Sequence, residues 1–368
     1  GRALMRICLL IPGSLDAVSG GCLYDRQLVA LLRQRGHHVN VESLPLRSYT
    51  GSLPVNLDLR LPRRLARGGY HILLQDELAH AALFAANPAI KQKARCPVVP
   101  IVHHLFCCEP EQSPLLAPLR RRMERRYLRT ADALVLASSH AGQCCRDLLS
   151  ELPEHVVAPP GADHAGHALS PDSIFRRRGD GSLKLLFVGH VTPRKGLLDS
   201  LRALARIKEV PWELHAAGNT GSDPRYADRV RRFVRQEGLQ DRVSILGKVP
   251  NEQLRRLYRE SHALYMPFAF EGYGIVFLEA MAAGLPVLAR QGCGAAEIVR
   301  HGESGFLLAP EDLDGTAARI RELAGDRERL LAMSHAAREA FLRHPSWEQS
   351  MGQVERFLAA LCWKNGSA

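Results

Sequence analysis

Residues 5–21 run Met-Arg-Ile-Cys-Leu-Leu-Ile-Pro-Gly-Ser-Leu-Asp-Ala-Val-Ser-Gly-Gly, an apolar segment followed by a loop that ends in two glycines. We expect 5–11 to form a buried β-strand, because it is short, almost continuously apolar and bounded by turn residues. The following residues place leucine and valine at 28, 29, 31 and 32, which is helical spacing, and stop at Arg35-Gly36. A basic last turn with a glycine after it is a common helix end. This order of strand, loop and helix predicts a parallel α/β fold.

The same alternation continues to the end of the chain and extends the α/β prediction to all of it. A chain of 368 residues also exceeds what one hydrophobic core usually supports, so we expect two domains. In the N-terminal half the expected strands are 5–11, 39–41, 70–75, 97–102, 133–137 and 155–158. In the C-terminal half they are 183–189, 213–217, 243–246, 263–266 and 287–289, with helices between them, for example 196–208 and 251–260.

The border between the two domains is marked by composition. From Pro159 to Ser182 the periodicity disappears and Pro, Gly, Ser, His and Asp dominate, which is typical of a linker. We therefore predict an N-terminal domain at 1–165, a linker at 166–182 and a C-terminal domain at 183–345. A final helical pattern within 346–368 stands apart after Pro345.

Composition limits the class of protein. No apolar run approaches the roughly 18 residues that a membrane span needs, and no small-residue cleavage site follows 5–11. The nine cysteines include no CxxC pair and no zinc-ligand spacing. We therefore expect a cytoplasmic protein with reduced thiols. The net charge of +11 is compatible with nucleic acid, an anionic membrane or phosphate-bearing substrates, and does not choose among them.

The first candidate site is the stretch Glu271-Gly-Tyr-Gly-Ile-Val-Phe-Leu-Glu279. Gly272 and Gly274 precede an expected helix that runs to Gly284, and the unpaired N–H groups at a helix start attract a phosphate. Glu279 is the one polar residue between 275 and 283. A buried carboxylate needs hydrogen bonds or a paired charge, so Glu279 binds either ribose hydroxyls or a buried arginine.

The second candidate site is Gly189-His-Val-Thr-Pro-Arg-Lys-Gly196, which follows a strand and begins a helix. Arg194 and Lys195 are adjacent cations that would neutralise a diphosphate, and a neutralised diphosphate leaves a sugar more easily. The alternative is a solvated turn.

The N-terminal half offers two features at expected strand ends, where α/β sheets bind ligands. One is the Gly20-Gly21 loop, and the other is His103-His104, directly after the strand 97–102.

Together these stretches resemble retaining glycosyltransferases of the GT-B fold, family 4. The pair Glu271 and Glu279 is similar to the E-x7-E signature of that family, and 189–196 is similar to its phosphate loop. The resemblance extends over nearly the whole chain. Further matching segments are Ser19-Gly20-Gly21, Val102-His103-His104, Pro159-Pro-Gly161, Pro267 to Glu279 with Gly284-Leu-Pro-Val287, and Gly302 to Phe306.

The resemblance implies a fold and a set of residue roles. The fold would be two Rossmann-like domains that face each other across a cleft, with the C-terminal helix returning to the N-terminal domain. Lys195 would bind the diphosphate and Glu279 the ribose, while Glu271 and His103 would contact the donor sugar. The doubled histidine leaves open whether His104 is the true counterpart. The remaining donor contacts implied are Gly20, Gly21, Gly189, Gly272, Gly274 and Ile275.

One position departs from the family pattern. The family usually has an arginine directly after the glycine of the phosphate loop, where this chain has His190. Either Arg194 supplies the second positive charge, or phosphate binding is weaker and depends on pH. The resemblance also implies a retaining hexosyltransferase that needs no metal and no cofactor besides the nucleotide-sugar co-substrate.

Two other classes of function remain as alternatives. A non-catalytic nucleotide-sugar-binding protein would keep Lys195 and Glu279, and an arginine-rich nucleic-acid-binding protein would use the arginines between 120 and 129. No RNA- or DNA-binding module accompanies those arginines, so we expect no nucleic-acid partner. The acceptor, whether glycan, lipid-linked or a small molecule, is not specified by the sequence.

The arginine-rich segment has two interpretations of its own. Six arginines at 120, 121, 122, 125, 126 and 129 alternate with Leu119, Met123, Tyr127 and Leu128, which predicts a basic amphipathic helix. The apolar residues either pack into the N-terminal domain or contact an anionic bilayer. In the second case the protein would be peripheral at the inner membrane face.

Overall fold

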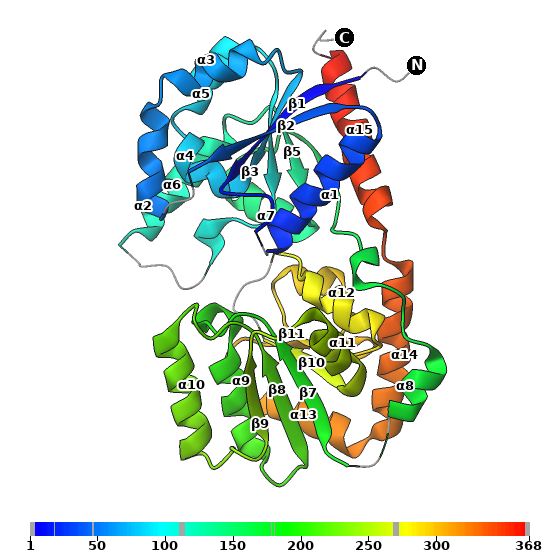
Figure 1. Cartoon of the computed structure of the whole chain (residues 1–368). Coiled ribbons are helices and arrows are strands. Elements are labelled where there is room, and N and C mark those ends of the chain that lie inside the picture. The colour runs from blue at the N-terminus through cyan, green and yellow to red at the C-terminus, as the bar shows by residue number, and fades with distance from the viewer. Residues whose placement is uncertain are drawn as a thin grey trace. The chain divides into compact units, whose positions relative to one another are not determined.

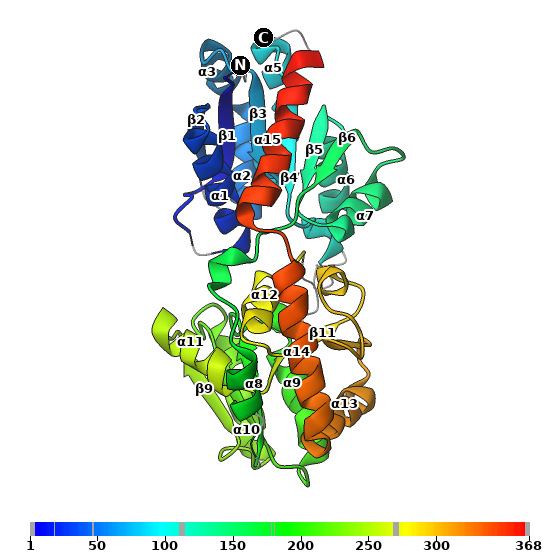
Figure 2. The same cartoon turned by 90° about the vertical axis from the view of Figure 1, so that its right-hand side faces the viewer.

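The computed structural model describes residues 4–17, 19–45, 48–109, 115–177, 179, 181–267 and 272–364. The chain forms two compact units, one of residues 1–161 with 345–368 and one of residues 162–344. Within the described residues each unit is built on one six-stranded, parallel sheet with helices on both faces (Figures 1 and 2). This confirms the α/β fold class with two Rossmann-like domains.

The sheet of the first unit has the order β2-β1-β3-β4-β5-β6. Its strands are β1 Arg6–Pro12, β2 His38–Leu44, β3 Ile72–Asp76, β4 Val98–Val102, β5 Ala133–Leu136 and β6 Glu154–Val157. Its helices are α1 Gly20–Gln34, α2 Tyr49–Ser52, α3 Arg60–Arg67, α4 His80–Leu83, α5 Asn87–Ala94, α6 Ala117–Leu128, α7 Ser139–Leu148 and α15 Trp347–Lys364, with short 3₁₀ turns η1 Leu53–Leu57, η2 Glu77–Ala79 and η3 Phe106–Cys108.

Alternation along β1 divides the apolar residues of the first unit between two cores. Ile7, Leu9 and Ile11 face the helices α1 and α15, whereas Cys8 and Leu10 face α3 to α7. Such alternation follows from the two-residue repeat of a strand, and burial on both faces explains why the segment is continuously apolar.

The last helix, α15, is part of the first unit and lies beside α1 (Figure 2). Its buried carboxylate Glu355 forms ion pairs with Arg35 and, at 3.1 Å, with His37. Gly161 permits the close approach of the helix start, because a Cβ there would meet the Trp347 nitrogen at 2.1 Å.

The sheet of the second unit has the order β12-β11-β10-β7-β8-β9. Its strands are β7 Leu183–Val188, β8 Trp212–Ala217, β9 Val243–Gly247, β10 Ala263–Met266, β11 Val287–Arg290 and β12 Gly305–Leu308. Its helices are α8 Pro171–Arg177, α9 Leu197–Leu204, α10 Pro224–Gln236, α11 Asn251–Glu260, α12 Ile275–Ala282, α13 Leu313–Gly325 and α14 Arg327–Arg343, with short 3₁₀ turns η4 Asp163–Ala165, η5 Pro193–Lys195, η6 Ala205–Ile207 and η7 Gly294–Glu297.

Two segments of the second unit differ from the sequence expectations. Residues 166–182, expected as a linker, contain α8 and belong to the second unit, where Arg177 donates hydrogen bonds to the carbonyl groups of Ala283 and Gly284. The second is the matching segment 302–306: it resembles a turn of the family, and here it begins as a turn but continues into β12, a strand that the sequence analysis did not expect, at Gly305. Both segments are rich in glycine or polar residues, so they lack the regular apolar spacing from which helices and strands are predicted.

Helix α6 accounts for most of the arginine-rich segment. Its residues Met123, Tyr127 and Leu128 are buried in the first unit, while Leu119 is exposed. Among the described residues, no helix combines the length and hydropathy that crossing a bilayer requires. The nine cysteines form no disulfide bond.

Candidate active site in two half-sites

The second unit carries the candidate donor half-site at the middle of its sheet. Numbered from β7, its strand order is 3-2-1-4-5-6, so the order reverses between β7 and β10. Ligands of open α/β sheets bind outside the carboxyl ends of the strands at such a reversal. The loop 189–196 follows β7 and the segment from Pro267 follows β10, which brings two sequence-predicted stretches to this point.

Glycines in and beside the loop after β7 allow it to pack closely against neighbouring backbone. Gly196 has a φ of +71°, and a Cβ there would meet the Pro267 carbonyl oxygen at 2.7 Å, so the loop touches the chain after β10. Gly189 lies against the Lys195 stem, because its Cβ would be 3.6 Å from the lysine Cδ. Arg194 and Lys195 form the last two residues of the 3₁₀ turn η5, directly before α9. A second glycine, Gly218, supports the loop, since its Cβ would be 1.8 Å from the Gly189 oxygen.

His190, the residue that replaces the family arginine, is exposed in this loop. Its Nδ1 contacts the Ser222 hydroxyl at 2.6 Å. The His190 imidazole therefore faces the segment after β8. If His190 contacts a phosphate, the same ring also keeps its hydrogen bond to the neutral Ser222 hydroxyl.

The entrance to α12 forms the other side of the donor half-site. Gly274 is the N-cap residue with a φ of +94°, and a Cβ there would meet the Phe277 ring at 2.3 Å, so both the backbone angle and the space favour glycine. Gly272 packs against η7, because a Cβ on Gly294 would lie 2.1 Å from the Gly272 oxygen. Ile275 is the first helical residue. Glu271 lies outside the described residues.

Glu279 is half-buried on α12 and accepts a hydrogen bond of 2.8 Å from the Tyr258 hydroxyl. Burial together with the Glu279 carboxylate raises the pKa of Tyr258 well above its ordinary value, so the phenol stays protonated and donates. The sequence analysis did not name Tyr258 or predict its hydrogen bond to Glu279. Tyr258 stands on the helical pattern 251–260, but nothing in that pattern marks its hydroxyl as a donor to another helix.

Glu279 and Tyr258 line a cavity of about 620 Å³ within the second unit. This volume is in the range of small-molecule sites, which is about 300–1,000 Å³. Its other walls come from α11, α12, the residues before α8 and the first turn of α8: Ala165, Gly166, His167, Ala168, Leu169, Ser170, Ser173, Asn251, Leu254, Arg255, Arg259, Ala282 and Ala283. Part of the segment expected as a linker is therefore a wall of this cavity.

The first unit carries a second half-site, again at a reversal of strand order, here between β1 and β3. The loop after β1 ends at Ser19, whose hydroxyl caps α1 by accepting from the Cys22 N–H at 3.1 Å. Gly20 and Gly21 are the first residues of α1. A Cβ on Gly21 would lie 3.1 Å from the His103 Cδ2, so the glycine leaves room for the imidazole.

His103 and His104 follow β4 and both contact Glu77, but their rings face different second carboxylates. His103 Nε2 lies 3.4 Å from Asp25 Oδ1, and the backbone N–H of His103 donates to Glu77 Oε2 at 2.9 Å. His104 is more exposed; its Nε2 lies 3.3 Å from Glu109 Oε1 and its Nδ1 lies 3.8 Å from Glu77 Oε1. Both histidines are therefore partly buried and face acids, with the His103 side chain less exposed, at 11% against 26% for His104.

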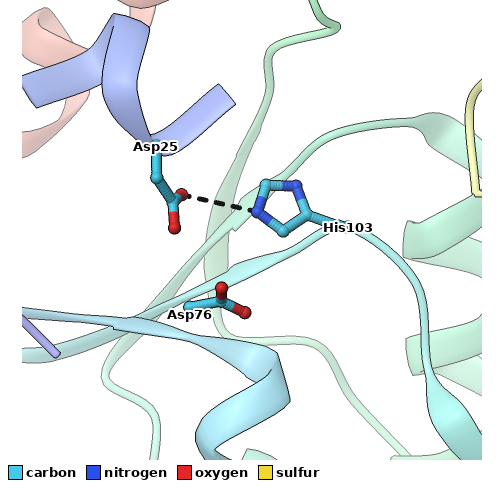
Figure 3. Close-up of side chains that lie close together, drawn as sticks. All are labelled: Asp25, Asp76 and His103. Carbon is cyan, nitrogen blue, oxygen red and sulfur yellow. Dashed lines mark ion pairs between the residues drawn. The ribbon is translucent and has the colours of Figure 1, made fainter. Parts of the chain in front are cut away.

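Three acidic residues missed by the sequence analysis surround His103. Asp25 is on α1 and Asp76 is the last residue of β3 (Figure 3). Glu77 follows Asp76 as the first residue of η2. Burial lowers the pKa of His103, but Glu77, Asp25 and Asp76 outweigh it and raise that pKa to about 10. Burial, and after it Glu77 and Asp25, raise the pKa of Asp76. The rule that identified His103-His104, polar residues directly after a strand, would also have identified Asp76-Glu77.

Comparison with known proteins decides the family. Residues 173–340 match the model of glycosyl transferases group 1. A D-inositol 3-phosphate glycosyltransferase of Acidothermus cellulolyticus is 30% identical over 381 aligned residues, which cover 90% of this chain and 84% of that protein. The chain belongs to the group 1 family of glycosyl transferases.

One further sequence relative and one solved structure are also similar to this group 1 chain. A GDP-mannose-dependent alpha-(1-6)-phosphatidylinositol monomannoside mannosyltransferase of Mycobacterium tuberculosis is 28% identical over 256 residues, covering 66% of each chain, so about a third of that relative lies outside the match. The solved structure of sucrose-phosphate synthase from Thermosynechococcus elongatus superimposes with a TM-score of 0.81 at 22% identity, over 97% of this chain and 99% of that one. The fold class is therefore GT-B, as expected from the sequence.

Proposed function

We propose that this group 1 glycosyl transferase moves a hexose-type sugar from a nucleotide-sugar donor to a hydroxyl acceptor, with retention of the anomeric configuration. The observation that carries the proposal is the donor half-site of the second unit. There the loop that carries Lys195 contacts the chain after β10 at Pro267, and α12 carries both the helix start at Gly274 and the Glu279 carboxylate in the cavity. The dependence of the mycobacterial relative on GDP-mannose supports a nucleotide-sugar donor.

In this proposal each part of the half-site binds one part of the donor. Lys195 and Arg194 neutralise the diphosphate, and backbone N–H groups at Gly274 and Ile275 approach the phosphate and the sugar. Glu279 accepts hydrogen bonds from the ribose hydroxyls, with the Tyr258 hydroxyl fixing one of its oxygens. Glu271 contacts hydroxyls of the donor sugar. The resemblance assigns Gly20, Gly21 and His103 of the first unit to the donor as well. In the second unit, Gly189, His190 and Gly272 shape the phosphate end of the half-site.

The chemistry follows from these contacts. As the sugar–phosphate bond breaks, charge develops on the leaving diphosphate, and fixed cations stabilise that charge in the transition state. With lysine and arginine as the cations, the leaving group requires no metal ion. The departing phosphate takes the proton of the acceptor hydroxyl on the face where the new bond forms, which retains the configuration without a covalent intermediate.

A two-step experiment tests the proposal. Thermal-shift screening against UDP-, GDP- and ADP-sugars identifies the donor, because a ligand that binds only the folded chain raises its melting temperature. The stabilising donor is then incubated with the protein and hydroxyl acceptors, and the product is followed by NMR. Release of nucleotide with an anomeric configuration equal to that of the donor supports the proposal. Stabilisation without any turnover would indicate a nucleotide-sugar-binding protein instead.

We propose in addition that the first unit contacts an anionic membrane surface through α6 and the residues before it. Leu115, Leu116 and Leu119 are exposed, and they are followed by the exposed arginines 121, 122, 125, 126 and 129. Each arginine near an anionic surface contributes about 1 kcal/mol within a Debye length. Met123, Tyr127 and Leu128 are buried in the first unit and cannot enter a bilayer. The membrane contact would therefore be made by the three exposed leucines and the exposed arginines.

Liposome co-sedimentation tests this contact. We expect binding to anionic but not neutral vesicles, lost at high salt and lost when Arg121, Arg122 and Arg125 are replaced by glutamate. The matched control replaces three exposed arginines of α10, Arg231, Arg232 and Arg235, with glutamate, which changes the net charge equally. Equal loss in both triple variants would mean that total charge and not α6 is responsible.

A further inference from the structure

Arg120, in the first turns of α6, is held by two aromatic rings of the first unit. Its guanidinium carbon lies 5.1 Å from the centroid of the Tyr49 ring and 5.0 Å from that of the Phe106 ring. The two rings belong to α2 and η3, and they stack with their centroids 5.3 Å apart. A guanidinium over an aromatic face is attracted by the quadrupole of the ring. The half-buried Arg120 side chain therefore has a defined position.

The positive charge of Arg120 has no acidic partner. Within the residues that the structure describes, no carboxylate forms an ion pair with its guanidinium. Glu124, one helical turn away, uses its two oxygens to accept from the backbone N–H groups of Phe106 and Cys107, at 2.7 Å each. Burial, with Glu124 adding to it, raises the pKa of Tyr49, so this phenol stays protonated and brings no negative charge. Arg120 thus keeps its charge and the N–H donors in the plane of its guanidinium.

Arg120, Tyr49 and Phe106, here called the aromatic platform, lie on the side of the first unit where the strands end. Helix α6 connects β4 to β5 of a parallel sheet, so its first turns lie beyond the carboxyl ends of the strands. Tyr49 begins α2, which follows β2, and its hydroxyl contacts Met123 of α6 (Figure 1). Ligands of open α/β sheets bind on this side.

His103, which the proposed reaction assigns to the donor sugar, is close to the platform along the chain. Phe106 is three residues after His103, and three residues span at most about 11 Å. Side chains connect the two as well. His80 Nε2 lies 3.2 Å from the Tyr49 hydroxyl, and its Nδ1 lies 2.8 Å from the Glu77 carbonyl oxygen. The Glu77 carboxylate accepts from the His103 N–H. A molecule the size of a sugar phosphate with one end beside His103 therefore reaches the platform with the other.

We propose that Arg120 binds an oxyanion group, a phosphate or a carboxylate, of the acceptor whose hydroxyl receives the sugar. The inference rests on the proposed transfer reaction, because that reaction brings the acceptor to the donor sugar. A guanidinium donates two parallel N–H bonds to such a group, which fixes its orientation as well as its affinity. Because the rings already restrict the side chain, less conformational freedom is lost on binding. The acceptor class is thus a hydroxyl compound that carries an oxyanion, either free or as the headgroup of a lipid.

Acceptors that differ in charge test the proposal on the full-length chain. Transfer from the donor that raises the melting temperature is measured with glucose, glucose 6-phosphate and glucuronate, and with glycerol, glycerol 3-phosphate and glycerate. A further arm uses vesicles that contain phosphatidylinositol or a neutral glucosyl diacylglycerol. We expect a charged member of a set to have the highest kcat/KM, and the soluble and vesicle arms distinguish a free compound from a lipid headgroup. A neutral compound as the preferred acceptor would overturn the proposal and leave the transfer reaction intact.

Substitutions of Arg120 separate acceptor binding from donor binding. Arg120→Gln should raise the KM for the preferred charged acceptor roughly 10- to 150-fold, because hydrogen bonds to a charged group are lost, and leave the KM for the donor unchanged. Arg120→Lys should keep part of the affinity, since lysine retains the charge but not the planar fork. The matched control is Arg229→Gln, which removes an arginine lying 6.0 Å from the centroid of the Tyr226 ring in the second unit. An unchanged acceptor KM in Arg120→Gln would overturn the proposal.

Chemical modification of arginine by phenylglyoxal provides a measurement that needs no turnover. Inorganic phosphate should slow the modification of Arg120, compared with chloride at the same ionic strength, and should not slow that of Arg229. Peptide mass spectrometry measures both rates. Protection of Arg120 in a chain that transfers no sugar would support the anion site and contradict the transfer reaction. Equal rates at Arg120 in the two salts would overturn the anion site, whether or not sugar is transferred.

Discussion

The two units have parallel sheets of the same size, but the residues at the carboxyl ends of their central strands differ in charge and burial. In the second unit that edge carries glycine-supported backbone and the adjacent cations Arg194 and Lys195. In the first unit it carries the buried acids Asp25, Asp76 and Glu77 around one histidine. The same topology therefore carries adjacent cations at one edge and buried acids that face a histidine at the other. Fold alone does not assign the chemistry, which depends on the side chains.

The largest effect is expected from Lys195→Ala. If the second unit binds the donor diphosphate, loss of this cation should lower turnover about 100- to 1,000-fold, as loss of one preorganised charge-stabilising group does. Binding of the nucleoside alone should change little. The control is Lys208→Ala, which removes an exposed lysine paired with Glu237 in the same unit. Steady-state kinetics and calorimetry measure the two quantities, and equal losses of turnover and nucleoside binding would assign Lys195 a structural role.

Glu279→Gln is expected to have the next largest effect. Loss of charge-assisted hydrogen bonds to ribose costs about 1.5–3 kcal/mol, or roughly 10- to 150-fold in nucleoside diphosphate affinity. Tyr258→Phe should cost less, since it removes one neutral donor to Glu279 and leaves the carboxylate. Glu260→Gln, on the exposed side of α11, is the control. Unchanged affinity in Glu279→Gln, measured by calorimetry, would exclude a ribose contact.

Two glycines of the second unit test whether backbone geometry shapes the donor half-site. Gly274→Ala places an alanine in a left-handed backbone conformation, which costs about 1–2 kcal/mol. Its new methyl group also clashes with the Phe277 ring. Gly238→Ala has a similar positive φ of +66° but open space around the new methyl group, so it bears only the first cost. We expect lower melting temperatures in both and weaker nucleotide binding only in Gly274→Ala. Parallel losses of binding would show that the α12 entrance has no special role.

The smallest effect concerns acid stability of the second unit. Burial, with nearby positive charges adding to it, lowers the pKa of His262 to about 4; the ring accepts from the Lys184 N–H at 2.9 Å. The unfolded chain binds this proton near the ordinary value of 6.5, so stability from the neutral ring is present above that pH and is lost as pH falls toward 4. His262→Asn should flatten the decline of melting temperature between pH 6.5 and 4, and the exposed His155→Asn should not. An unchanged slope in His262→Asn would contradict this assignment.

The sequence predicted eleven of the twelve described strands and the two-unit organisation of the fold, because buried parallel strands are continuously apolar. It did not predict β12, whose four residues follow a glycine-rich turn. It also did not predict the pairing of Tyr258 with Glu279 or the position of Asp25 beside His103. Both contacts join residues far apart in the sequence, and they depend on how separate elements pack in three dimensions. The periodicity of the sequence does not contain this information. The positions of Gly189 and Lys195 in the loop after β7, and of Gly274 at the start of α12, were predictable because loops at strand ends have short, local sequence patterns; their roles toward a donor stay predictions.

Hydrogen–deuterium exchange of the full chain tests most directly the claim that the second unit binds the donor. The experiment compares the free protein with the complex of whichever nucleoside diphosphate raises the melting temperature most. We predict that protection is strongest in peptides covering 189–196, 251–260 and 275–283, which contain the loop after β7 and the walls of the cavity around Glu279. Protection confined to peptides of the first unit, with none in these three segments, would contradict the account.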